Sequence, residues 1–193
     1  MLLWHGTTEK YADHIRKNGI DLRKSRSQLD FGPGFYMTNE VGLAERTARH
    51  KTLRENSRFS RQDRAAVISF QVDESAFKNL CLKKFNFSSS KWLEYVILNR
   101  LRSDLLTLTQ LQVSNHDGKY DLSIGPTADG SVANDVYAIG KSASSGGIVI
   151  ERDLYRRFLP SMGEQYAFHT EKSLTCIDQS TCDIILLDIE ERS

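Results

Sequence analysis

The pattern of hydrophobic and polar positions changes its period several times along the chain, and each period indicates a different element. Residues 65–72 (AAVISFQV) are an almost continuous apolar run with several β-branched residues, which predicts a buried strand. Shorter apolar runs, most of them beside glycine or proline, predict further strands. These lie at residues 2–5, 35–38, 120–125, 165–170 and 182–189, with a short extended piece at 77–82.

Four other stretches have the three-to-four-residue apolar spacing that is typical of helices. Thr8 is placed to cap the first helix, which the Asn-Gly pair at residues 18–19 brings to an end. The other helices are expected at residues 40–52, 91–101 and 129–157, the last interrupted by a loop at 142–147.

The expected elements follow one another without an internal repeat or a low-complexity tail. A length of 193 residues fits one domain, spanning residues 1–193. The mixture of strands and helices predicts an α+β fold in which helices are inserted between strands.

Composition narrows the class of protein without identifying a function. Hydrophobic residues make up 39% and charged residues 26% of the chain, and the formal net charge of +1 gives no overall field that attracts nucleic acid or a membrane. The cysteines (Cys81, Cys176 and Cys182) lack metal-ligand spacing, so we expect neither a disulfide framework nor a metal site. With no apolar leader and no run of transmembrane length, the sequence predicts a cytoplasmic protein.

Two short segments combine residue types that suit a flat, charged ring attached to a sugar. In residues 4–8 (WHGTT), His5 ends a strand beside Gly6, so the imidazole can bond a sugar hydroxyl while the glycine backbone approaches a ligand closely. In residues 30–38 (DFGPGFYMT), a stiff turn brings Tyr36 to the edge of a strand, where its ring can stack on a pyridinium. Taken alone, each feature is explained more simply as a structural histidine or an alternating strand residue.

A third segment, residues 163–170 (GEQYAFHT), carries Gln165 at the start of a half-apolar strand. Alternation along a strand places Gln165 on one face and the neighbouring Glu164 on the other. A polar side chain here is a candidate for reaching a ribose hydroxyl, although a solvated strand end explains it more simply.

Together the three segments resemble the His–Tyr–Glu signature of diphtheria-toxin-like ADP-ribosyltransferases and poly(ADP-ribose) polymerases. The chain is more closely similar to a bacterial branch of that superfamily, which adds a segment like residues 120–129 (YDLSIGPTAD); Trp92 and residues 99–100 (Asn-Arg) also match it. The resemblance covers residues 1–174 and implies split mixed or antiparallel β-sheets with inserted helices.

The resemblance implies a role for each matching residue. His5 would bond a ribose hydroxyl of NAD, Gly6 would hold the nicotinamide carboxamide through its backbone, and Tyr36 would stack on the nicotinamide ring. Gln165 falls where the family most often has its catalytic glutamate, and it keeps the hydrogen bonding but not the negative charge. The catalytic set is thus His5, Tyr36 and Gln165, and the residues expected to bind NAD, the co-substrate, are His5, Gly6, Thr7, Arg26, Gly34 and Tyr36.

Four further features bear on this prediction. Where the polymerases place a serine and a second aromatic ring on the helix after the tyrosine strand, this chain has Ala44 and Thr47. Arg26 suits the NAD pyrophosphate and equally an ordinary surface position. Asp129 suits the orientation of a substrate, though a helix N-cap is its simpler role. The basic stretch 46–64 is expected to be a helix end and an exposed loop, a solvated face rather than a nucleic-acid site.

The sequence thus predicts an NAD-dependent (mono-)ADP-ribosyltransferase, a glycosyltransferase-class enzyme that releases nicotinamide and modifies a protein or nucleic-acid acceptor without a metal or a membrane partner. A toxin role, with an antitoxin or regulator as partner, follows by family analogy alone. Three alternatives stay open: an NAD glycohydrolase with water as acceptor, an inactive NAD- or ADP-ribose-binding protein marked by Gln165, and a protein- or RNA-binding module that shares only the fold.

Overall fold

A seven-stranded mixed sheet is the frame of the computed structural model, which describes residues 1–100, 115, 118–128 and 163–188. Within these residues the strand order is β4-β5-β6-β2-β1-β3-β7, and neighbours are antiparallel except for the parallel pair β4 and β5. The predicted α+β class is therefore confirmed. The strands are β1 Leu2–Thr8, β2 Phe35–Thr38, β3 Ala65–Val72, β4 Leu82–Lys84, β5 Leu122–Pro126, β6 Glu164–Phe168 and β7 Ile177–Leu187.

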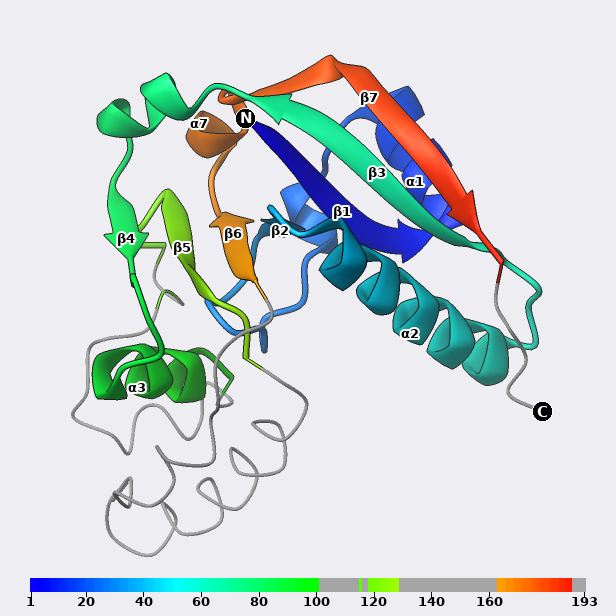
Figure 1. Ribbon diagram of the computed structural model, residues 1–193, viewed down its shortest axis with the longest axis horizontal. Coiled ribbons are helices and arrows are strands. Elements are labelled where there is room, and N and C mark those ends of the chain that lie inside the picture. Colours follow the sequence, from blue (N-terminus) through cyan, green and yellow to red (C-terminus); the bar gives the residue numbers. More distant parts are fainter. Residues whose placement is uncertain (101–114, 116–117, 129–162, 189–193) are drawn as a thin grey trace, which may run out of the picture.

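The sheet consists of two halves that meet along a very short contact. β1 pairs with β3 along its whole length, from Leu2 opposite Gln71 to Thr8 opposite Ala65. In contrast, β1 and β2 share a single register pair, Trp4 opposite Thr38. Figure 1 shows β1, β3 and β7 crossing the upper right of the molecule, while β4, β5 and β6 lie to the left. Among the described strands, β1 therefore has a neighbour on one edge only after its first residues.

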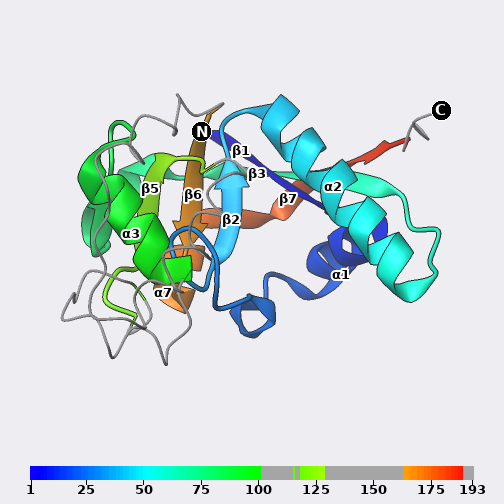
Figure 2. The ribbon, with the colours of Figure 1, turned by 90° about the horizontal axis from the view of Figure 1, so that it is seen from below.

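Two helices flank the half that contains β1, one on each face. The helix α1 (Glu9–Asn18) begins at the predicted cap, where Thr8 accepts a hydrogen bond from the Tyr11 amide, and it ends at Gly19. Its Ile15 packs on the cluster that contains Ile68 of β3, whereas α2 (Val41–Phe59) packs on the opposite face of that strand, against Ala65 and Val67. Figure 2, viewed from below, separates the two helices clearly.

The helix α3 (Ser90–Arg100) belongs to the other half. Its described side chains are buried almost all round, as expected for a helix inside the core rather than on its surface. It packs with Phe31, Phe85 and Ala167 in one hydrophobic cluster. Within the described residues, the other helices are η1 Leu22–Lys24, η2 Glu74–Asn79 and α7 Glu171–Leu174.

The prediction for residues 46–64 is wrong, because α2 continues to Phe59 instead of ending near residue 52. Polar residues in its second half are buried, so the inner stripe continues although the apolar pattern stops. The residues buried along this stripe are Ala44, Ala48, Thr52 and Glu55.

Smaller differences concern the ends of elements. Part of the expected extended piece at 77–82 is instead the 3-10 helix η2, and β7 begins at Ile177 rather than at residue 182. The predicted helical segments at 129–157 lie outside the described residues. None of the helices within the described ranges is long and apolar enough to cross a membrane.

Gly6 allows α2 to lie directly on β1. A Cβ atom at this position would stand 2.0 Å from the carbonyl oxygen of Ala44 and 2.8 Å from the amide nitrogen of Ala48. Both neighbours are helix backbone, which cannot turn aside as a flexible side chain can. A larger residue at position 6 must therefore push the helix away from the strand.

We expect Gly6→Ala to lower the free energy of unfolding by about 1–3 kcal/mol, the usual cost of overpacking, or by more if α2 cannot shift. The matched control is Gly42→Ala in α2, the helix that packs on Gly6. The nearest atom to the Cβ added at position 42 is Arg46 Nη1 at 3.8 Å. The control should be neutral or stabilising by up to about 1 kcal/mol, because alanine favours helix. Denaturant unfolding measures both variants, and a Gly6→Ala protein as stable as the parent would contradict the contact.

Candidate functional site

A cavity of about 760 Å³ lies between the parted strands β1 and β2. Its size is in the usual range of small-molecule pockets, about 300–1,000 Å³. Side chains from both halves of the sheet and from α1 and α2 form its walls. All the residues that the sequence analysis selected for binding or catalysis line this one cavity: His5, Gly6, Thr7, Arg26, Gly34, Tyr36 and Gln165.

His5 connects the two halves of the sheet at the cavity wall. Its Nδ1 atom lies 2.6 Å from the carbonyl oxygen of Tyr36, and because a carbonyl can only accept, Nδ1 carries the proton. Its ring stacks on Phe35, with 4.4 Å between ring centroids. Burial, and next the positive charge of Lys51, lower the pKa of His5 to about 3. The imidazole is therefore neutral at physiological pH, and its Nε2 atom can act as an acceptor only.

The backbone of Gly6 points into the gap between the strands. The terminal ammonium group of Met1 and the amide of Glu9 donate to the carbonyl oxygens of Val72 and Arg64, on the β3 side of β1. Because backbone groups alternate along a strand, odd-numbered residues of β1 face β3 and even-numbered ones face away from it. The N–H and C=O of Gly6 thus face the cavity, beyond the single register pair that β1 makes with β2.

Tyr36 is held firmly by the turn that precedes it. Its hydroxyl donates to the carbonyl oxygen of Gly32 at 2.6 Å and accepts from the amide of Phe31 at 2.9 Å. Burial, and next the charge of Asp30, raise the pKa of this hydroxyl well above its usual value. The hydroxyl is therefore committed to the protein, which leaves the ring as the part of Tyr36 that a ligand can use.

Gly34 has a packing reason to be glycine. A Cβ atom there would lie 2.8 Å from the carbonyl oxygen of Phe168 and 2.9 Å from Nδ1 of His169. Its amide and its carbonyl both bond the hydroxyl of Ser25, at 2.7 and 2.9 Å. Gly34 thus adds contact surface to the cavity, while its backbone donor is already engaged.

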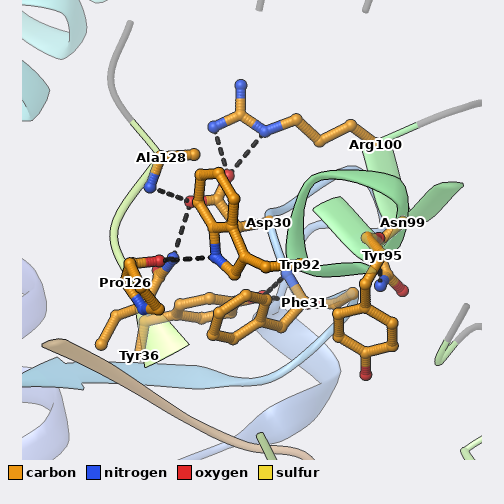
Figure 3. Close-up of polar contacts among 11 residues, drawn as sticks. Asp30, Phe31, Tyr36, Trp92, Tyr95, Asn99, Arg100, Pro126 and Ala128 are labelled. Carbon is orange, nitrogen blue, oxygen red and sulfur yellow. Dashed lines mark hydrogen bonds and ion pairs between the residues drawn. The ribbon is translucent and has the colours of Figure 1, made fainter. Parts of the chain in front are cut away.

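A buried polar network is centred on Asp30, which Figure 3 shows, and the side chain of Gln165 belongs to it. Its Nε2 atom donates to Oδ2 of Asp30 at 2.8 Å and to the carbonyl oxygen of Pro126 at 3.2 Å. The guanidinium of Arg100 bonds the other carboxylate oxygen of Asp30, with Nε at 2.6 Å, and the amide of Ala128 reaches Oδ2 at 3.3 Å. Gln165 and Asp30 are each only 7% exposed.

Sequence reasoning missed Asp30. The residue begins the segment 30–38, and its signal was a carboxylate immediately before a Phe-Gly-Pro-Gly turn in an otherwise apolar stretch. Its partners lie 70 to 135 residues away, so local pattern could not reveal them. By contrast, Glu164 lies as alternation predicts, since its carboxylate bonds Tyr166 on the face opposite to Gln165.

Basic side chains gather at another part of the cavity wall. Lys51 donates to the hydroxyl of Thr7 at 2.9 Å, and burial, together with the charges of Arg26 and Arg54, lowers its pKa to about 8 against an opposing effect of Glu55. Arg26 lies 3.7 Å from the buried carboxylate of Glu55. Arg26, Lys51 and Arg54 all line the cavity, so part of the basic stretch is a cavity wall rather than a solvated face.

Among the residues that the structure describes, this wall of the cavity lacks the second aromatic ring that the polymerases carry after the tyrosine strand. Ala44 and Thr47 both line the cavity and offer no ring. Other aromatic side chains do line it, namely Trp4, Tyr11 and Phe35. The role suggested for Asp129 lies outside the described residues.

The chain belongs to the DUF3990 family, whose members are described as proteins of unknown function, and the match spans residues 1–179. Neither a curated protein nor a solved structure matches the chain. The membership groups this sequence with others of its kind and leaves its activity to be argued from the cavity.

We expect the His5 imidazole to stay neutral, with its proton on Nδ1, from pH 8 to about pH 4, because its pKa is about 3. In the unfolded chain the ring takes up a second proton, on Nε2, near pH 6.5, so the free energy of unfolding should fall as the pH is lowered from about 6.5 towards 3. Nitrogen-15 NMR of the imidazole measures the tautomer and the pKa, and His5→Gln should remove this part of the pH dependence. A folded-state pKa near 6.5 would contradict the buried, neutral geometry.

Proposed function

We propose that the chain is an ADP-ribosyltransferase that binds NAD in the cavity between β1 and β2, releases nicotinamide and transfers ADP-ribose to a macromolecular acceptor. The observation that carries the proposal is the meeting of three distant segments. His5, Tyr36 and Gln165, chosen from their resemblance to the His–Tyr–Glu signature, line the same cavity. A chance similarity of short motifs gives no reason for residues so far apart in sequence to line one cavity.

The chemistry of each group matches a part of the nicotinamide riboside. The neutral Nε2 of His5 suits a ribose hydroxyl, which can donate to it. The backbone N–H and C=O of Gly6 suit a carboxamide, which needs one acceptor and one donor. The ring of Tyr36 suits the face of a pyridinium, where a cation gains roughly 0.5–2 kcal/mol.

The reaction needs little covalent chemistry from the protein. The bond between the ribose carbon and the pyridine nitrogen breaks, both electrons stay with nitrogen, and nicotinamide leaves as a neutral molecule. An oxygen or nitrogen of the acceptor then bonds the same carbon and gives up its proton. The protein binds and orients the substrate and lines the oxocarbenium-like sugar with acceptor groups such as the side-chain oxygen of Gln165.

The basic part of the cavity wall suits the diphosphate of NAD. Arg26, Lys51 and Arg54 bring three positive charges to the cavity, and Glu55 is the nearby carboxylate. Guanidinium and ammonium groups are the usual protein partners of phosphate oxygens. We therefore place the nicotinamide end at His5 and Tyr36 and the diphosphate towards Lys51.

The first test is NAD binding by calorimetry and nicotinamide release by chromatography. We expect His5→Ala and Tyr36→Ala each to weaken binding or turnover by about tenfold or more, since about 1.4 kcal/mol corresponds to tenfold. Two controls should stay within about threefold. His50→Ala removes an exposed histidine of α2, and Gly42→Ala changes another position of the same helix; neither residue lines the cavity.

The outcomes separate the alternatives. Label from NAD on a protein or nucleic acid supports transfer, whereas free ADP-ribose as the sole product identifies an NAD glycohydrolase. Tight binding without release under any acceptor condition identifies an inactive NAD-binding protein. Absence of NAD binding, or loss of binding that is equal in the control variants, would falsify the proposed site.

Affinity for NAD should also fall as pH rises from 7 to 9, because Lys51, with a pKa of about 8, loses its charge in this range. The expected weakening is roughly fivefold or more, as a hydrogen bond to a charged group contributes about 1.5–3 kcal/mol. Lys51→Arg stays charged and should give a flat profile, and Lys51→Met should give a flat profile at lower affinity. An unchanged pH profile in Lys51→Met would remove Lys51 from the binding site.

A further inference from the structure

The orientation of the Gln165 side-chain amide is fixed by its surroundings. Asp30 Oδ2 and the carbonyl oxygen of Pro126 are both acceptors, so the NH₂ group of Gln165 must face them and uses both of its hydrogens there. The amide oxygen then points the other way. Among the described residues, no group bonds this oxygen. The described side-chain atoms that are buried without a hydrogen-bond partner are Thr52 Oγ1 and Asp63 Oδ2, so the oxygen of Gln165 is not fully buried. Since Gln165 lines the cavity, its oxygen is offered to whatever the cavity holds.

Asp30 is held as rigidly as the amide that it orients. Arg100 grips one carboxylate oxygen through two nitrogen atoms, and the amide of Ala128 lies against the other. Trp92 donates to the same Pro126 carbonyl that accepts from Gln165, at 3.0 Å. Figure 3 shows Asp30 between Arg100 and Ala128, with Trp92 and Pro126 beside it. Because the groups around the Gln165 amide are themselves hydrogen-bonded in this buried network, the amide can adopt only one orientation.

We propose that Asp30 is a positioning residue, whose carboxylate orients and polarises the Gln165 amide so that its oxygen is a fixed acceptor for a sugar hydroxyl. The pair would do the work of one glutamate. Gln165 supplies the acceptor oxygen, and Asp30 supplies the negative charge directly behind the amide. The identity of the sugar rests on the proposed function, whereas the coupling between Asp30 and Gln165 does not.

This pairing gives a physical reason for a glutamine at position 165, where the His–Tyr–Glu signature has a glutamate. In Gln165→Glu, a second carboxylate would stand where the amide now donates to Asp30 at 2.8 Å. Two buried carboxylates at this distance do not both ionise, so one of them keeps its proton well above its usual pKa. A glutamate at position 165 therefore conflicts with Asp30 in this chain and does not restore a missing function.

The test compares four proteins: the parent, Asp30→Asn, Gln165→Glu and the double variant. Their unfolding midpoints are measured at pH 5 and pH 8. Gln165→Glu should be clearly less stable at pH 8 than at pH 5, because the folded protein keeps a proton on this carboxyl pair that the unfolded chain releases as the pH rises. In the double variant, the amide introduced at position 30 can donate to the carboxylate introduced at position 165, and the net charge beside Arg100 is unchanged. The extra pH dependence should therefore disappear.

The same four proteins are then assayed for NAD turnover. Asp30→Asn should lower kcat at least tenfold with a smaller change in KM, because the acceptor oxygen is no longer fixed, and the double variant should recover most of that loss. If Asp30 had a purely structural role, Asp30→Asn would lower kcat by the same factor in the parent and in the Gln165→Glu variant. That result would overturn the proposal. If Asp30→Asn does not fold, the unfolding midpoints of Gln165→Glu and of the double variant at pH 5 and pH 8 are compared, and this comparison alone tests the proposal.

The two proposals can fail separately. A parent protein that ignores NAD, together with pH-dependent coupling between positions 30 and 165, overturns the transferase function and supports the positioning role of Asp30. NAD turnover without such coupling supports the transferase function and overturns the positioning role of Asp30.

Discussion

The arrangement of the whole molecule depends on one strand being paired along a single edge. β1 satisfies half of its backbone groups against β3, and after Trp4 the other half has no strand to pair with. Buried backbone groups without partners cost free energy, so such an edge must face water or a ligand. Two contacts hold β1 in place beside this edge without pairing its backbone groups: the His5 ring bonds the Tyr36 carbonyl of β2 across the gap, and Gly6 lies against α2. The weakest line of the sheet is thus also the place where a bound molecule has most to gain.

The opposite wall of the cavity is rigid for a different reason. The segment from Asp30 to Tyr36 is fixed internally by the Tyr36 hydroxyl and externally by Arg100. A buried carboxylate is costly unless it is paired and hydrogen-bonded, and Asp30 is both. The cavity therefore has one wall held by backbone packing and another held by a polar network, and Gln165 belongs to the second.

Some of this architecture is legible in the sequence, and the rest is not. The bounds of β2 and β3 follow from a Gly-Pro-Gly turn and an apolar run, both local signals. The length of α2 could not be predicted, because its second half buries polar residues such as Glu55, which a pattern treats as solvent-facing. The seven residues chosen from motifs share one cavity, while Asp30 and Lys51 escaped notice because their partners are distant in sequence. Hydrogen bonds across 44 or 135 residues leave no periodic trace.

The register of β6 has a consequence for how the protein is made. β6 enters the sheet between β5 and β2, with Ala167 opposite Tyr36, so it closes a loop of more than a hundred residues. During synthesis, β1, β2 and β3 are complete long before Gln165 leaves the ribosome. Nascent chains can thus form the His5 side of the cavity before the side-chain amide of Gln165 is available to bond the Asp30 carboxylate. The finished site appears late and all at once, as the final strands dock.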